Sequence, residues 1–180
     1  MPSITDPQIT SLKELLHLLD HASLDEMGNL LRRAVITPKD LEPICHWDNN
    51  CYTRTCIFKS EKMEVLLLSW KAGQETEIHN HGGQKCWVHQ MMGSITEKKY
   101  LVNEKKTLEE ISQITISKGE CSYIDDNMGV HSLHNYSKEK SVSLHLYIKP
   151  IQECMIYKDT EEDFLKEMSY DYLNLIPCEQ

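Results

Sequence analysis

The sequence lacks the long apolar runs, secretory signal and repeats that are typical of membrane, secreted and low-complexity proteins. No apolar run among its 180 residues approaches the roughly 18 to 20 residues that a membrane-spanning helix needs. Residues 1 to 10 lack the basic start and apolar centre of a secretory signal. No internal repeat, low-complexity segment or linker is visible. We therefore expect a cytoplasmic protein that does not contact a membrane.

Positive charge is also scarce. The sequence has 19 lysines and arginines against 28 aspartates and glutamates, which gives a net charge of -9 and a pI near 5.4. A nucleic-acid surface needs clustered basic residues. The only such cluster here, at residues 98 and 99 with 105 and 106, is flanked by glutamates. We expect no nucleic-acid partner.

Paired cysteine motifs are missing. The seven cysteines form an odd set without a C-x-x-C pair, so the sequence signals neither a disulfide framework nor a zinc ribbon. Reduced thiols are the expectation, most of them small buried apolar residues. Cys86 stands apart because of the histidines that precede it. The cysteines lie at positions 45, 51, 56, 86, 121, 154 and 178.

The length predicts one domain, residues 1 to 180, with a β fold as its main part. Residues 1 to 45 form a helical segment, because leucines recur at helical spacing behind Ser11 and Ser23, and Thr37 with Pro38 starts a third short helix. From 50 to 155, short β-branched segments separated by turn signals predict antiparallel strands that close into a sandwich or barrel. Residues 156 to 180 form an extension of strand and coil over the barrel.

The stretch IHNHGGQKC, residues 78 to 86, carries the first chemical signal. On a strand, His79 and His81 project from one face, about 6.6 Å apart, so their rings can converge on one ion. Imidazole suits zinc, copper, nickel and iron. A returning antiparallel strand would add His131, and the two glycines after His81 allow a tight turn. The other histidines have no partner that the sequence reveals, and we interpret them as solvated or packing residues: His17, His21, His46, His89 and His134.

The stretch SVSLHLYIK, residues 141 to 149, alternates apolar residues with Ser143, His145 and Tyr147. The polar face lies either in water or in a pocket. A row of hydroxyls and an imidazole favours a pocket that manages protons. Arg54, beside Tyr52, could grip a carboxylate with two parallel hydrogen bonds or form an exposed salt bridge, and its residue type alone favours the salt bridge.

These motifs resemble a known superfamily. Gly73-x5-His79-x-His81-x4-Cys86-x6-Gly93 is similar to the first motif of the cupins, and Gly119 with His131-x3-Asn135 is similar to the second. Most metal cupins have a glutamate ligand where this chain has Cys86. That departure, with the stretches YTR, GVH and VSLHLY, resembles the cysteine dioxygenase family over residues 52 to 154.

The resemblance implies a cupin-type jelly-roll β-barrel and a role for each motif residue. His79, His81 and His131 would hold iron(II), Fe(II). Arg54, with Tyr52 nearby, would bind the carboxylate of L-cysteine, which reacts with O2 to give cysteine sulfinate. Cys86 and Tyr147 would be the catalytic pair that forms a thioether cross-link in some members. His145 and Ser143 would be hydrogen-bonded behind Tyr147, and Trp70 would be an aromatic of the pocket wall.

The sequence leaves other functions open. Arg54 favours a substrate with a carboxylate over cysteamine. The related family that prefers 3-mercaptopropionate tends to lack this arginine, so its presence favours cysteine. A non-catalytic cupin that binds metal and a plain structural barrel are the remaining alternatives. We expect a monomer whose partners are only small molecules.

Overall fold

The computed structural model of the chain describes residues 6–104, 107–158 and 162–177. The predicted N-terminal helices are confirmed. Ser11 and Thr37 cap the first and third helices with their side chains, and Ser23 forms a capping box with Glu26. No helix within these ranges is long and apolar enough to cross a membrane. The helices are α1 (Leu12–His21), α2 (Leu24–Arg33) and α3 (Pro38–Leu41), with the 3-10 turns η1 (Glu42–Ile44) and η2 (Asp126–Met128).

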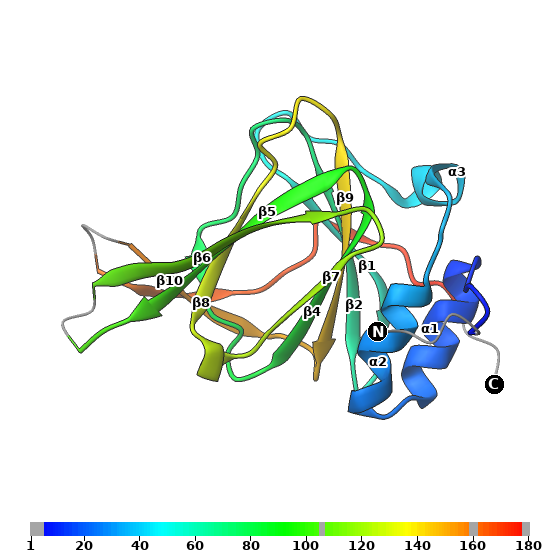
Figure 1. Cartoon of the computed structure of the whole chain (residues 1–180), viewed down its shortest axis with the longest axis horizontal. Helices are drawn as coiled ribbons and strands as arrows, with labels where there is room; N and C mark the ends of the chain where they lie inside the picture. The colour runs from blue at the N-terminus through cyan, green and yellow to red at the C-terminus, as the bar shows by residue number, and fades with distance from the viewer. Residues whose placement is uncertain (1–5, 105–106, 159–161, 178–180) are drawn as a thin grey trace.

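The strands form two six-stranded sheets that face each other, as Figure 1 shows. One sheet has the order β12-β1-β2-β9-β4-β7 and the other the order β11-β10-β3-β8-β5-β6. The turn spacing predicted antiparallel strands closed into a sandwich or barrel, and the resemblance to the cupins implied a jelly roll; the mainly β, two-sheet arrangement confirms both. The strands are β1 (Thr53–Lys59), β2 (Glu64–Trp70), β3 (Ile78–His79), β4 (Lys85–Met92), β5 (Ser94–Val102), β6 (Leu108–Ser117), β7 (Cys121–Ile124), β8 (Val130–His134), β9 (Ser141–Ile148), β10 (Glu153–Tyr157), β11 (Phe164–Glu167) and β12 (Tyr172–Leu173).

The helices cover the outer face of the first sheet (Figure 1). Leucines at helical spacing on α1 pack in one cluster with the apolar residues of β2 and β9 that point outward. This cluster includes Leu15, Leu16, Leu19, Val65, Leu67, Leu144 and Leu146. The helical segment therefore acts as a cover for the barrel, and none of its residues from 6 onward lines the interior cavity.

The other faces of β2 and β9 point between the sheets. Leu66, Leu68 and Trp70 of β2 belong to a second buried cluster that also holds Cys86 and Tyr147. Both faces of β9 are thus buried, which excludes the alternative that its polar face lies in water. Ser143, His145 and Tyr147 are at most 4% exposed.

The C-terminal extension joins the two sheets. β11 pairs with β10 in one sheet, and β12 pairs in parallel with β1 in the other. Between them, the N–H of Asp171 donates to the carbonyl of Arg54. β10 continues to Tyr157, past the expected end of the barrel core at residue 155. The crossing of the extension forms one wall of the cavity described below.

Candidate metal centre and its cavity

Three histidines converge between the sheets. β3 and β8 are antiparallel neighbours in which His79 lies opposite His131, and His81 follows two residues after His79. One ring nitrogen from each histidine lies within 4.8 Å of the other two. The ring centroids are 4.7 to 5.3 Å apart. The structure thus brings together the three histidines that the sequence predicted as a metal site.

His81 reaches this position from a turn, so its predicted place on a strand was wrong. β3 ends at His79, and Gly82 and Gly83 adopt φ angles of 57° and 81°. A Cβ at Gly82 would collide with the carbonyl oxygen of Glu153, so only glycine fits there. The carboxylate of Asp126 accepts the N–H groups of His81 at 2.8 Å and of Gly83 at 2.7 Å. The turn is therefore fixed from two sides.

Two of the three rings are oriented by hydrogen bonds on their far side. The Nδ1–H of His131 donates to the fully buried Glu97 at 2.7 Å, and the Nδ1–H of His79 donates to the carbonyl of Glu77 at 2.8 Å. Glu97 is in turn held by the Ser122 hydroxyl at 2.5 Å and lies 3.6 Å from the Lys99 ammonium. Because Nδ1 carries the proton, the lone pair of Nε2 is left for another ligand.

The ring of His81 is 1% exposed, and neither of its nitrogens has a hydrogen-bond partner among the described residues. A buried unsatisfied imidazole is unfavourable unless it binds something. Burial lowers the pKa of His79 to about 4 and lowers the pKa of His81 and His131 well below the usual range, so all three are neutral donors. Three neutral imidazoles fit a transition metal and leave further coordination positions open.

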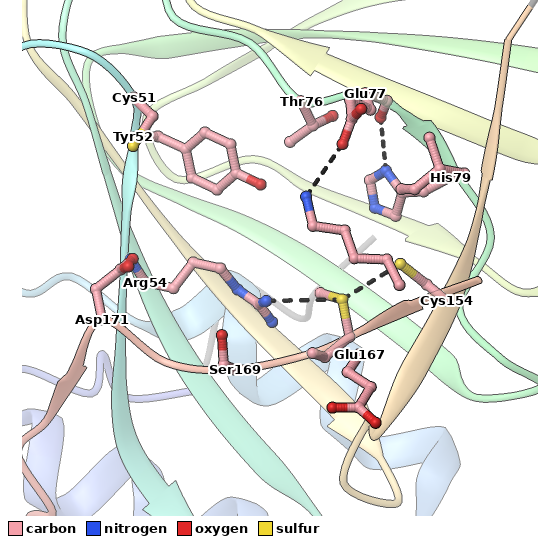
Figure 2. A pocket seen from close by; sticks show the side chains of 13 residues that line it. Cys51, Tyr52, Arg54, Thr76, Glu77, His79, Cys154, Glu167, Ser169 and Asp171 are labelled. Atoms are coloured by element: carbon pink, nitrogen blue, oxygen red, sulfur yellow. Dashed lines mark hydrogen bonds and ion pairs between the residues drawn. The ribbon is translucent and has the colours of Figure 1, made fainter. Parts of the chain in front are cut away.

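A cavity of about 220 Å³ opens beside this cluster, and His79 lines it (Figure 2). Its walls come from both sheets and from the C-terminal extension. Neither His81 nor His131 is among its lining residues, so His79 is the member of the triad that faces it. The lining residues are Cys51, Tyr52, Arg54, Thr76, Glu77, His79, Cys154, Ile156, Lys166, Glu167, Met168, Ser169 and Asp171.

Arg54 projects into this cavity from β1 (Figure 2). The residue is only 9% exposed, and its Nη2 has no partner within the part of the chain that the structure describes. Nη1 contacts the sulfur of Met168 at 3.7 Å, and no carboxylate among the described residues pairs with the guanidinium. Within the described ranges, the exposed salt bridge that its residue type favoured is not formed. A buried cation without a counter-ion is a binding point for an anion.

Tyr52 lines the cavity, and Trp70 lies directly behind it. Trp70 stacks behind Tyr52 with ring centroids 4.5 Å apart and is completely buried. Its indole N–H donates to the Ser143 hydroxyl at 2.9 Å, and that hydroxyl is 2.9 Å from Nε2 of His145. Trp70 therefore supports the site from behind.

Cys86 and Tyr147 are directly opposite each other on the neighbouring strands β4 and β9. Side chains at such a position lie about 5 Å apart at Cβ. The Tyr147 ring is 6.0 Å from the His81 ring and 6.3 Å from the His145 ring. Burial raises the pKa of both the Cys86 thiol and the Tyr147 hydroxyl well above their usual ranges, so both groups stay protonated.

A model of the family cysteine dioxygenase type I matches residues 2–160 of the chain. The chain belongs to the cysteine dioxygenase type I family. It is 29% identical over 153 residues to cysteine dioxygenase type 1 of Rattus norvegicus, covering 81% of this chain and 76% of that one. It is 28% identical over 143 residues to the Danio rerio protein, covering 77% and 71%. The chain is thus an enzyme of a dioxygenase family of oxidoreductases.

Solved structures with a similar arrangement belong to the cupins and double-stranded β-helix proteins. TT1209 from Thermus thermophilus has a TM-score of 0.49 and 20% identity, covering 62% of this chain and 96% of that one. A protein with a double-stranded β-helix domain from Klebsiella pneumoniae has a TM-score of 0.49 and 14% identity, covering 71% and 95%.

The remaining histidines of this dioxygenase family member lie outside the triad. His17 and His21 are exposed on α1, His46 stacks on Tyr172, and the buried His89 donates to the carbonyl of Glu120. His134, whose partner the sequence did not reveal, is a buried residue held by two hydrogen bonds. Its Nδ1 lies 2.8 Å from Glu75, and its Nε2 lies 2.7 Å from the Ser132 hydroxyl.

Three charged residues around the site were missed by the sequence analysis: Glu97, Glu77 and Lys166. Glu97 holds His131, and Glu77 pairs with Lys166 in the cavity. Lone charged residues on a strand look like ordinary solvent-facing positions. The neighbours of Glu97 in β5, Thr96 and Lys98, are polar, so the local sequence gave no sign that it is buried.

Proposed function

We propose that the protein oxidises L-cysteine with O2 to cysteine sulfinate at an iron(II) centre held by His79, His81 and His131. The supporting observation is the buried, unpaired guanidinium of Arg54 in the same cavity that His79 lines. A cavity lined by a cation and by one member of a neutral histidine cluster suits a substrate that carries both a carboxylate and a metal-binding group.

Arg54 orients the substrate by holding its carboxylate with two parallel hydrogen bonds. This places the thiol at the end of the cavity where His79 lies. Iron(II), held by the three histidines, would supply the chemistry that brings the thiolate and O2 together for oxidation of the sulfur. Three neutral imidazoles, in place of two and a carboxylate, keep the positive charge of the site high, which stabilises an anionic thiolate.

Tyr147 provides a protonated hydroxyl on the inner side of the triad, since burial raises its pKa. It can donate a hydrogen bond to a developing negative charge on oxygen. The chain from Trp70 through Ser143 to His145 fixes the imidazole that stacks beside the Tyr147 ring. Tyr52 also lines the cavity, where it would confine the substrate, and Trp70 supports it from behind.

We further propose that Cys86 and Tyr147 become joined by a thioether bond between the cysteine sulfur and the tyrosine ring. Their opposed positions on β4 and β9 bring the two side chains together. Formation of the bond removes two hydrogens, which O2 can accept as oxidant. Peptide mass spectrometry of active protein should find the two peptides joined with that mass loss. Only separate, unmodified peptides would contradict the cross-link.

Oxygen uptake tests the proposed function. Purified protein loaded with iron(II) should consume O2 with L-cysteine and much less with cysteamine, which lacks the carboxylate that Arg54 binds. Protein loaded with zinc is the matched control. Turnover of 3-mercaptopropionate in preference to cysteine would reassign the substrate, and no uptake with any thiol would leave a metal-binding cupin without this activity. We propose that the enzyme works as a cytoplasmic monomer, where its cysteines stay reduced.

A further inference from the structure

The cavity contains a second cation, which the metal centre and Arg54 do not explain. Lys166 enters from β11, and its ammonium lies 3.0 Å from a carboxylate oxygen of Glu77, marked by a dashed line in Figure 2. The two side chains are 47% and 43% exposed. β11 belongs to the C-terminal extension, so this ion pair joins the extension to the residue two positions before His79.

The two cations of the cavity differ in one respect. Arg54 is buried and has no carboxylate partner among the residues the structure describes, whereas Lys166 is occupied by Glu77. Glu77 is held in place because its carbonyl accepts the Nδ1–H of His79. That carbonyl belongs to the backbone, while the Glu77 carboxylate lines the cavity and pairs with Lys166 there (Figure 2).

We propose that Glu77 is a specificity-determining residue that restricts the cavity to thiols with a single carboxylate. The inference rests on the proposed function, in which Arg54 binds the carboxylate of a thiol substrate. A second carboxylate on the substrate would need the Lys166 ammonium, which Glu77 already neutralises. It would also approach the negative charge of Glu77 itself, and like charges at close range oppose binding.

Two thiols that differ by one carboxylate test this inference. Mercaptosuccinate is 3-mercaptopropionate with an added carboxylate on the carbon that carries sulfur. The dissociation constants of both should be measured by calorimetry without oxygen on the iron-loaded full chain, so that no turnover is required. The wild-type protein should bind 3-mercaptopropionate more tightly than mercaptosuccinate.

Glu77→Gln should improve the affinity for mercaptosuccinate relative to 3-mercaptopropionate by about fivefold, because Lys166 becomes available in a partly exposed position. Adding Lys166→Met to Glu77→Gln should reverse that gain. Glu167→Gln is the matched control, because it removes the same charge from the same cavity but leaves the Lys166 partner in place. Its affinity ratio should stay within about twofold of wild type.

An unchanged ratio in Glu77→Gln would overturn the inference. So would an equal gain in Glu167→Gln, which would indicate a general effect of charge, or a gain that persists without Lys166. A wild-type protein that binds neither thiol would also overturn it. If the ratio changes as expected but cysteine causes no oxygen uptake, the proposed reaction fails while the role of Glu77 in binding stands.

Discussion

The two ends of the cavity prepare their functional groups in opposite ways. At the metal end, burial makes three histidines neutral, and two of the rings are oriented by the hydrogen bonds they donate to the Glu97 carboxylate and the Glu77 carbonyl. At the other end, Arg54 keeps its charge but has no counter-ion in the described structure. Donors for a metal need defined tautomers, whereas a group that captures a substrate anion must not be satisfied in advance. The contrast is that between a site for a metal ion that stays bound and a site for a substrate that binds and leaves.

The two ends also come from different sheets. His79 and His131 lie on neighbouring strands of one sheet, and Arg54 lies on β1 of the other. A substitution at one end should therefore leave the other end folded. The following variants test this separation, from the largest expected effect to the smallest.

Loss of one histidine should remove the metal. His81→Ala leaves two donors, so we expect less than a tenth of the wild-type iron content and no measurable oxygen uptake. Elemental analysis of purified protein gives the metal content. His17→Gln, an exposed histidine on α1, is the control and should retain full iron. Full iron content in His81→Ala would remove this residue from the metal centre.

Loss of the Arg54 charge should weaken substrate capture but spare the metal. Arg54→Gln should raise the KM for cysteine by about 100-fold, because a charge-assisted hydrogen-bond pair to a carboxylate is lost. Iron content and the weak activity with cysteamine should not change. Arg32→Gln, on the exposed part of α2, is the matched control. An unaltered KM for cysteine would place the carboxylate elsewhere.

Glu97 should raise the affinity for iron by positioning His131. Glu97→Gln keeps the size of the side chain but loses the charge that holds the imidazole N–H, so iron affinity should fall by about 10-fold. Competition with a chelator measures this affinity at fixed pH. Glu110→Gln changes a partly exposed glutamate of β6 and should have no effect. Equal affinities in the two variants would make Glu97 only a structural residue.

Burial alone does not make a histidine a ligand, as His89 shows. Burial lowers its pKa to about 4, against about 6.5 in the unfolded chain. Between these values the unfolded state takes up a proton that the folded state does not, so stability falls as pH decreases from about 6.5 to 4. His89→Gln should reduce this loss by roughly 2 to 3 kcal/mol in urea unfolding at several pH values. His21→Gln changes an exposed histidine and is the control; it should leave the loss of stability at low pH unchanged.

The sequence predicted much of this arrangement because the decisive patterns are short. The H-x-H spacing, the alternation in β9 and the cysteine at position 86 are local, and their residues lie between the sheets in the structure. The helix caps at Ser11 and Thr37 are local as well. Such features depend on neighbours within a few residues, which a sequence displays directly.

The missed features depend on contacts between distant segments. Glu97 is 34 residues from His131, and Glu77 is 89 residues from Lys166. Nothing in the local sequence of either glutamate names its partner. The turn that carries His81 was also missed, because the carboxylate that fixes it comes from Asp126, 45 residues away. Whether Arg54 was paired or unpaired likewise depended on which acids the fold placed near it.

The most direct test of the proposed reaction is the fate of labelled oxygen. Iron-loaded protein should convert L-cysteine under ¹⁸O2 into cysteine sulfinate that contains two labelled oxygen atoms, with one O2 consumed for each cysteine. Mass spectrometry of the product measures both quantities. A product with no label or a single labelled atom, or the formation of cystine alone, would contradict the assignment of this site as a cysteine dioxygenase centre.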